Sequence, residues 1–148
     1  MLEVGQKVPN FSAQDQNGET ISLEDYKGKK VVIYFYPKDN TPGCTAQACN
    51  LRDNYEALLE AGYVVLGVSR DSGKSHQKFI DKYELPFPLI ADEDGSVHEV
   101  FGTWGEKKTF GRTYMGTIRT TFVIDEEGVV SEVIKKVKTK DHTAQILV

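Results

Sequence analysis

Two continuous apolar runs dominate the hydrophobic pattern of this chain. Residues 31–36 are all β-branched or aromatic, and residues 63–68 form a second run interrupted by one glycine. Such runs are typical of strands that are buried on both faces of a sheet. Between them, apolar residues recur at helical spacing until Gly62 ends the pattern: Leu51, Tyr55, Leu58 and Leu59. We therefore predict a strand, a helix over residues 45–61 and a second, parallel strand, joined by a right-handed crossover.

A short β-hairpin is predicted before this unit. Residues 11–15 and 20–23 are half-apolar runs that flank Asn17 and Gly18. Asn-Gly is a preferred dipeptide of hairpin turns, because both residues tolerate a positive φ. The chain is therefore expected to open with a small hairpin.

Short helices and strands are predicted to alternate through the second half of the chain. In order, these are a helix, a strand, a helix, a β-hairpin and a last short helix: residues 75–83, 88–91, 95–101, 119–134 and a segment capped by Asp141. Residues 102–116 are rich in glycine, lysine and threonine, and no regular element is predicted there. Loops of that length are often functional or mobile. The whole pattern indicates one α/β domain over residues 1–148.

Composition and charge narrow the class of protein. A chain of 148 residues with 39% hydrophobic content suits one domain with a real core. A net charge of −4 argues against a nucleic acid or an anionic membrane as partner. Residues 1–12 lack the basic and apolar segments of a secretory leader, and no apolar run is long enough to span a bilayer. We expect a soluble, cytoplasmic protein.

Cys44 is the strongest candidate for chemistry. It follows the first apolar run, comes directly after Pro42 and Gly43, and lies at the predicted start of a helix. The free N–H groups and partial positive charge of a helix N-terminus favour a thiolate, which is the nucleophilic form of cysteine. Thr41 places a hydroxyl three residues before the sulfur. The sequence thus predicts a reactive cysteine at this strand-to-helix junction.

The second cysteine, Cys49, follows five residues later. On one regular helix the two Cα atoms would lie roughly 8 to 9 Å apart. A disulfide tolerates only about 4.4 to 6.8 Å. Any bond between these cysteines therefore requires the first helical turns to unwind. The spacing indicates a pair that forms and breaks its bond during function.

Other uses of the cysteines are less favoured. Two buried, inert cysteines would behave as small hydrophobic residues, which is the usual state of a free cysteine. A structural disulfide framework needs more cysteines in a shorter chain. A metal site is not indicated, because no Cys-x-x-Cys or His-x-x-x-His pair occurs and the histidines are scattered: His76, His98 and His142. We assign His76 and His98 no role.

Three separated segments carry a resemblance to a known family. Pro37, Thr41 and Cys44 match the Pro-x-x-x-Thr-x-x-Cys active-site motif of the peroxiredoxins. A second cysteine five residues on resembles the bacterioferritin comigratory protein, or Q-type, subfamily. Residues 67–72 and 116–125, the latter with Arg119, agree as well, and the match runs over residues 8–134.

The resemblance implies a thioredoxin-like fold, with a central mixed sheet flanked by helices and an added N-terminal hairpin. It implies that Cys44 attacks a peroxide and becomes a sulfenic acid, that Cys49 then forms a disulfide with it, and that thioredoxin or a similar dithiol reductant resets the pair. Arg119 and Thr41 would contact the thiolate and the peroxide, together with backbone N–H groups of Gly43 and Cys44, while Pro37 would shield the sulfur from water. No metal, flavin or haem is implied, and a monomer is expected.

Two other functions compete with a peroxidase. A thioredoxin-type disulfide oxidoreductase would need Cys-x-x-Cys, which this chain lacks. A non-enzymatic redox sensor shares the first oxidation step with a peroxidase, and only steady turnover with a reductant separates the two. A purely structural domain would leave Thr41, Arg119 and the cysteine spacing unexplained.

Overall fold

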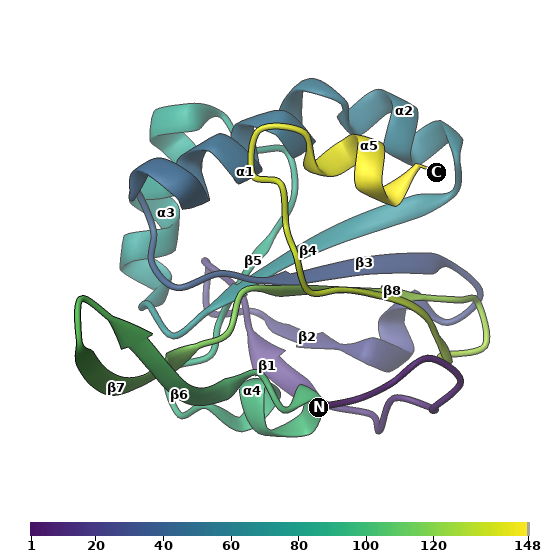
Figure 1. The fold of residues 1–148 in the computed structure, drawn as a ribbon. Coiled ribbons are helices and arrows are strands. Elements are labelled where there is room, and N and C mark those ends of the chain that lie inside the picture. Colours follow the sequence, from purple (N-terminus) through teal and green to yellow (C-terminus); the bar gives the residue numbers. More distant parts are fainter. Residues whose placement is uncertain (148) are drawn as a thin grey trace.

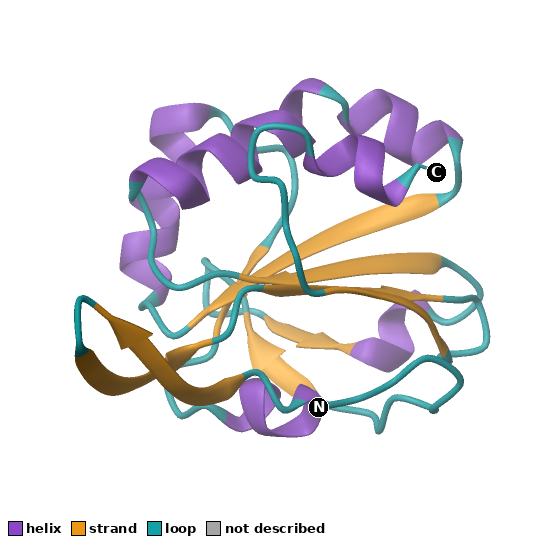
Figure 2. Cartoon of the chain, viewed as in Figure 1, coloured by secondary structure: helices purple, strands orange, loops and turns teal. Residues whose placement is uncertain are grey.

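A five-stranded mixed sheet forms the centre of the computed structural model, which describes residues 1–147 (Figure 1). The elements in chain order are β1 (Ser12–Gln14), β2 (Thr20–Ser22), the 3-10 helix η1 (Leu23–Tyr26), β3 (Lys30–Phe35), α1 (Pro42–Asp53), α2 (Tyr55–Glu60), β4 (Tyr63–Ser69), α3 (Gly73–Tyr83), β5 (Leu89–Ala91), α4 (Ser96–Phe101), β6 (Trp104–Thr109), β7 (Arg112–Thr117), β8 (Thr120–Ile124), β9 (Val130–Ile134) and α5 (His142–Ile146). Helices lie on both sides of the sheet, with α1, α2, α3 and α5 on one face (Figure 2).

The strand β3 lies at the middle of the sheet, whose order is β5-β4-β3-β8-β9. It pairs in parallel with β4 and antiparallel with β8. Alternate side chains of β3 enter two separate cores, Val32 and Tyr34 beneath α1 to α3, and Ile33 and Phe35 towards α4 and the N-terminal hairpin. Because both faces are covered, the strand needs the continuous apolar run seen in the sequence. The predicted strand–helix–strand unit and the N-terminal hairpin are confirmed.

The predicted single helix over residues 45–61 is wrong in one respect. The structure has two helices, because Asn54 leaves the helical conformation with φ −113° and ψ 15°. The Asn54 side chain donates to the carbonyl of Asn50, and such local bonds compete with helix continuation. Leu59, which belongs to the apolar pattern of the predicted helix, lies in the second segment and is 47% exposed.

Residues 102–116 also differ from the prediction, because they form the β6–β7 hairpin instead of an irregular loop. Most of its side chains are exposed, so the apolar alternation that marks a half-buried strand is missing. The turn residues Phe110 and Gly111 both have positive φ, 52° and 75°. A phenylalanine at such a position is not a recognisable turn signal.

The last helix, α5, forms as predicted, but Asp141 makes no side-chain cap. The N–H group of Thr143 instead donates to the side-chain oxygen of Asn50 in α1 at 2.8 Å, and the Asn50 amide donates to the carbonyl of Lys140 at 3.1 Å. A residue of α1 therefore caps a helix that is more than ninety positions away in the chain. Within residues 1–147, no helix is long and apolar enough to cross a membrane.

Candidate active site

Cys44 is the third residue of α1, at the point where the chain has just left the carboxyl end of β3. Thr41 occupies the N-cap position with extended backbone, and Pro42 starts the helix, where its missing N–H is not needed. The cysteine is 2% exposed and is a free thiol. The backbone N–H groups of Gly43 and Cys44 belong to the first turn, which has no intrahelical acceptors for them. The predicted placement of Cys44 at the mouth of a helix is confirmed.

Arg119 comes from the segment between β7 and β8 and reaches the sulfur of Cys44. Its Nη2 lies 3.2 Å from Cys44 Sγ, although the two residues are 75 positions apart. They meet because β8 is the immediate neighbour of β3, so the start of β8 lies beside the end of β3. A Cβ atom at position 43 would lie 3.4 Å from Arg119 Nη2, at van der Waals contact, so the guanidinium packs closely against the first turn of α1.

Gln47 is a site residue that sequence reasoning misses. It lies one helical turn after Cys44, is fully buried, and accepts a 2.6 Å hydrogen bond from Arg119 Nη1. Its own Nε2 has no partner among the described residues. The signal available in the sequence was the spacing of three, which places Gln47 and Cys44 on the same face of a helix.

Thr41 and Pro37 both lie in or next to the loop between β3 and α1, and both are half-buried. The Thr41 hydroxyl donates to the carbonyl of Lys38 at 2.8 Å. Its bond to the Cys44 thiolate, and the shielding role of Pro37, stay predictions.

Cys49 lies in the same unbroken helix as Cys44 and is half-buried. Both cysteines are free thiols. Five residues along a regular helix separate their Cα atoms by roughly 8 to 9 Å, beyond the span of a disulfide. The two cysteines therefore cannot form a disulfide until part of α1 unwinds.

A buried polar network anchors the loop that leads to Cys44. Asp39, in that loop, accepts hydrogen bonds from the hydroxyls of Tyr36 at 2.6 Å and Ser75 at 2.8 Å, and lies 2.7 Å from Nδ1 of His76. The other ring nitrogen of His76 lies 2.9 Å from the carbonyl of Ile90, which can only accept. Burial raises the pKa of the Tyr36 phenol well above its usual range, and the nearby Asp39 adds to this effect. The sequence analysis assigns His76 no role, whereas in the structure its contact with Asp39 connects the loop to α3.

The other two histidines are buried and hydrogen-bonded as well. His98 Nδ1 lies 2.5 Å from a carboxylate oxygen of Asp92, and His142 Nε2 lies 2.8 Å from the hydroxyl of Thr121. Among the residues described, no group of three or more histidine, cysteine, aspartate or glutamate side chains is placed to hold a metal ion.

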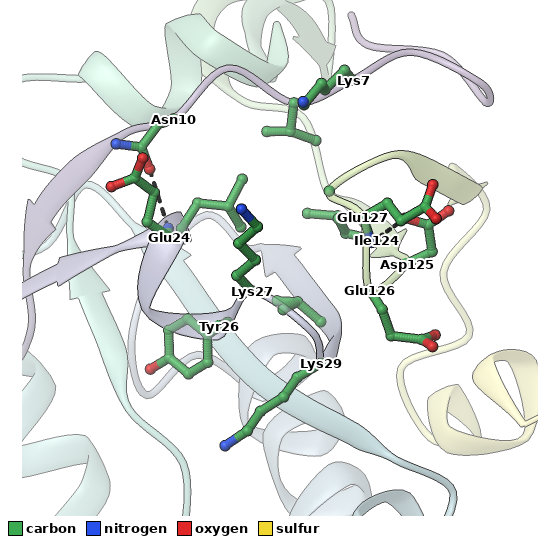
Figure 3. Close-up of a pocket in the computed structure, with 14 residues that line it drawn as sticks. Lys7, Asn10, Glu24, Tyr26, Lys27, Lys29, Ile124, Asp125, Glu126 and Glu127 are labelled. Atoms are coloured by element: carbon green, nitrogen blue, oxygen red, sulfur yellow. Dashed lines mark hydrogen bonds between the residues drawn. The ribbon is translucent and has the colours of Figure 1, made fainter.

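A separate cavity lies at the opposite end of the sheet, near the start of β3 (Figure 3). Lys27 and Lys29 line it from the segment after η1, and Glu126 and Glu127 line it from the β8–β9 turn. Neither cysteine is among its lining residues, so the cavity does not belong to the site around Cys44.

Comparisons with known proteins agree with this geometry. Residues 4–133 match the AhpC/TSA family. The chain is 54% identical to a putative peroxiredoxin bcp of Coxiella burnetii, over 99% of this chain and 97% of that protein, and 49% identical to the peroxiredoxin Bcp of Bacillus subtilis, over 99% and 93%. Its fold matches peroxiredoxin Q of Xanthomonas campestris with a TM-score of 0.87 and 37% identity, over 93% of this chain and 87% of that one. A Xylella fastidiosa PrxQ gives 0.92 and 31%, over 99% and 94%.

This chain belongs to the peroxiredoxin family, in its bacterioferritin comigratory protein (Q-type) subfamily. The peroxiredoxin is accordingly a thiol-dependent peroxidase, an oxidoreductase with a thioredoxin-like fold. The resemblance stated from the motif around Cys44 is confirmed, as is the predicted fold class with its N-terminal hairpin.

Proposed function

We propose that this peroxiredoxin reduces hydrogen peroxide and organic hydroperoxides in antioxidant defence, through a Cys44 sulfenic acid and an intramolecular Cys44–Cys49 disulfide that thioredoxin reduces. The contact that carries the proposal is the 3.2 Å approach of Arg119 Nη2 to Cys44 Sγ at the first turn of α1. A guanidinium and helix N-terminal N–H groups together stabilise negative charge on a sulfur.

In the first step, the Cys44 thiolate attacks one peroxide oxygen and the O–O bond breaks. The attacked oxygen stays on sulfur as a sulfenic acid, and the other leaves as water or an alcohol after taking up a proton. Negative charge grows on the leaving oxygen, so donors that already point there lower the barrier. Arg119, Thr41 and the N–H groups of Gly43 and Cys44 are the proposed donors, and Pro37 limits the access of water. The position of Arg119 beside the sulfur supports this assignment.

In the second step, Cys49 acts as the resolving thiol. Its sulfur attacks the sulfenic sulfur, a disulfide forms and the sulfenic oxygen leaves as water. Cys49 is the only other thiol in the chain. Because both cysteines occupy one helix in the reduced protein, the first turns of α1 unwind before the bond can form.

In the third step, thioredoxin reduces the disulfide by thiol–disulfide exchange and becomes oxidised itself. A reducing compartment suits this cycle, since thiols there are kept reduced, and we place the protein in the cytoplasm as a monomer. Organic hydroperoxides are included because the Xanthomonas campestris bacterioferritin comigratory protein, which is 36% identical to this chain, has alkyl peroxide reduction activity.

A thiol count with intact mass tests the proposal. The fully reduced protein receives one equivalent of hydrogen peroxide at neutral pH and is quenched within seconds. Loss of both thiols without added oxygen supports the disulfide, and survival of both thiols rejects the peroxidase. Turnover with thioredoxin and its reductase then separates a peroxidase from a redox sensor, because a sensor is oxidised once and does not cycle.

A further inference from the structure

The β6–β7 hairpin presents an unusual exposed surface. Within residues 1–147 the two strands pair only with each other, and the ribbon extends beyond the body of the molecule (Figure 1). Phe110, at its tip, is 99% exposed. Further large apolar side chains of the hairpin are also exposed: Trp104, Tyr114 and Met115. In the β6–β7 register, Trp104, Lys108 and Met115 lie on one face of the ribbon, and Arg112 and Tyr114 lie on the other. These residues therefore surround the tip from both faces, and we call the whole set, with Phe110, the hairpin surface.

Phe110 occupies a turn position whose backbone conformation is unfavourable for a bulky side chain. Phe110 and Gly111 form a two-residue loop in which both φ angles are positive, at 52° and 75°. This loop suits Asn-Gly, and a bulky residue at positive φ is an outlier. The hairpin therefore accepts backbone strain and a fully exposed aromatic ring at one residue. Local rules are broken in this way mainly at functional positions.

The charge of the hairpin is opposite to that of the whole chain. The hairpin carries three cationic side chains, Lys107, Lys108 and Arg112, and one carboxylate, Glu106. The whole chain, in contrast, carries a net charge of −4. Lys107 donates to the carbonyl of Thr117, so Lys108 and Arg112 are the exposed cations next to the tip. An apolar ring flanked by cations fits a partner surface that is apolar with an acidic rim.

The hairpin leads directly into the active site. Ile118 closes its base by donating to the carbonyl of Thr103 at 2.7 Å, and the next residue, Arg119, contacts Cys44. Six residues of strand extend the tip about 20 Å from this base. A protein–protein interface of about 800 Å² per partner is roughly 30 Å across. A protein that reaches the cysteine pair can therefore cover Phe110 as well.

We infer that the hairpin surface is the docking site for the dithiol protein that reduces the Cys44–Cys49 disulfide, and that this partner has an apolar, acid-rimmed surface around its own cysteines. The inference rests on the proposed function. Phe110 is the central anchor, since exposed aromatic and arginine side chains supply most of the binding energy in such interfaces. An anionic membrane is a weaker candidate, because stable anchoring takes more than one aromatic ring and a few cations.

The Phe110→Asn variant tests the anchor without harming the turn, because Asn-Gly is the preferred sequence there. Three rates are measured for it: oxidation of the reduced protein by hydrogen peroxide, reduction of the disulfide by dithiothreitol, and reduction by thioredoxin over a range of concentrations. We expect the first two to stay unchanged and kcat/KM for thioredoxin to fall at least tenfold. Leu59→Gln is the control, since it removes another exposed large apolar residue, 47% exposed against 99% for Phe110, at the opposite end of the sheet, beside Lys30 and Gly62.

A charge reversal gives a second, independent test. Lys108→Glu combined with Arg112→Glu is expected to lower kcat/KM for thioredoxin at low salt by more than tenfold, with the difference shrinking as ionic strength rises. Lys27→Glu combined with Lys29→Glu changes the net charge equally at the opposite end of the sheet and is expected to have little effect.

Four outcomes overturn the inference. The first is an unchanged kcat/KM for thioredoxin in Phe110→Asn, and the second is an equal fall of that kcat/KM in Leu59→Gln. The third is an equal fall in the rate at which dithiothreitol reduces the Phe110→Asn disulfide. The fourth is a wild-type disulfide that only small thiols such as glutathione reduce. Binding to phosphatidylglycerol vesicles that Phe110→Asn abolishes, with thioredoxin kinetics unchanged, would assign the hairpin to a membrane instead. Failure of the proposed peroxidase step is distinguishable, because the wild-type protein would then not lose its thiols to peroxide. A disulfide that forms but resists thioredoxin would remove the proposed reductant together with this inference.

Discussion

Arg119 and Gln47 are joined by a 2.6 Å hydrogen bond from Nη1 to Oε1, while Nη2 of the same guanidinium reaches Cys44 Sγ. Gln47 thus fixes the direction from which the positive charge meets the sulfur. Because Gln47 is fully buried and one turn from Cys44, the contact is preorganised before any peroxide arrives.

Replacing Gln47 by leucine keeps the buried volume and removes the acceptor. Hydrogen bonds to charged groups contribute about 1.5–3 kcal/mol, so we expect the rate constant for Cys44 oxidation to fall roughly ten- to hundredfold. Stopped-flow measurement of peroxide oxidation checks this. Gln47→Glu retains an acceptor and should keep more activity than Gln47→Leu. Equal rates in all three proteins would show that Arg119 is positioned without Gln47.

Replacing Cys49 by serine removes the proposed resolving thiol. The variant should lose one thiol to one equivalent of peroxide and gain one oxygen in its intact mass, because the sulfenic acid has no partner in the chain. Turnover with thioredoxin should fall to background, and a small added thiol should restore part of it. Undiminished thioredoxin-driven turnover would reject Cys49 as the resolving residue.

Oxidation should loosen α1 and, through it, α5. The disulfide requires residues 45–50 to leave the helix, so their amides should exchange faster in the oxidised protein. The Thr143 amide should lose protection at the same time, because its acceptor is the side chain of Asn50. Hydrogen exchange of the oxidised and reduced proteins, read by mass spectrometry, checks both. Identical exchange in the two forms would contradict the unwinding.

Replacing Asp39 by alanine should destabilise the loop that carries the active site. The change leaves His76 and the Tyr36 hydroxyl without their buried partner. Each buried polar group that loses its hydrogen-bond partner costs about 1–3 kcal/mol, so the free energy of unfolding should fall by about that amount for each of the two groups. Urea denaturation measures this, and adding His76→Ala should recover part of the loss. A purely additive double variant would mean that the two side chains are not coupled.

Acid should weaken the docking of α5 through His142. Burial lowers the pKa of His142 below its ordinary value of 6.5, the hydrogen bond to Gln145 opposes this, and the charge of Arg119 adds to it. Below about pH 6.5 the unfolded chain therefore takes up a proton that the folded protein does not, and the free energy of unfolding falls. Urea denaturation between pH 7.5 and pH 5.5 should show a larger drop for the wild type than for His142→Gln. Parallel curves would exclude this contribution.

Local patterns were sufficient for much of the fold. The strands β3 and β4, the start of α1 and the N-terminal hairpin follow from apolar runs, Pro42 and Asn17-Gly18. The same patterns fail at Asn54, where a side-chain hydrogen bond ends a helix that the apolar spacing would continue. They also fail in the β6–β7 hairpin, because strands exposed on both faces carry no apolar alternation.

The sequence by itself determined the candidate cysteine, its place at a helix start, the spacing of Cys44 and Cys49 within that helix, and the family motif. These features depend on residues within about one to two helical turns of one another, so periodicity and turn chemistry are enough to predict them. Only the tertiary structure decided what surrounds the sulfur. Arg119 meets Cys44 because β8 pairs beside β3, Asp39 meets His76 because α3 packs over the loop, and Asn50 caps α5 across the surface of the domain. Contacts between such distant positions are set by the order of strands and the packing of helices, which no local pattern records.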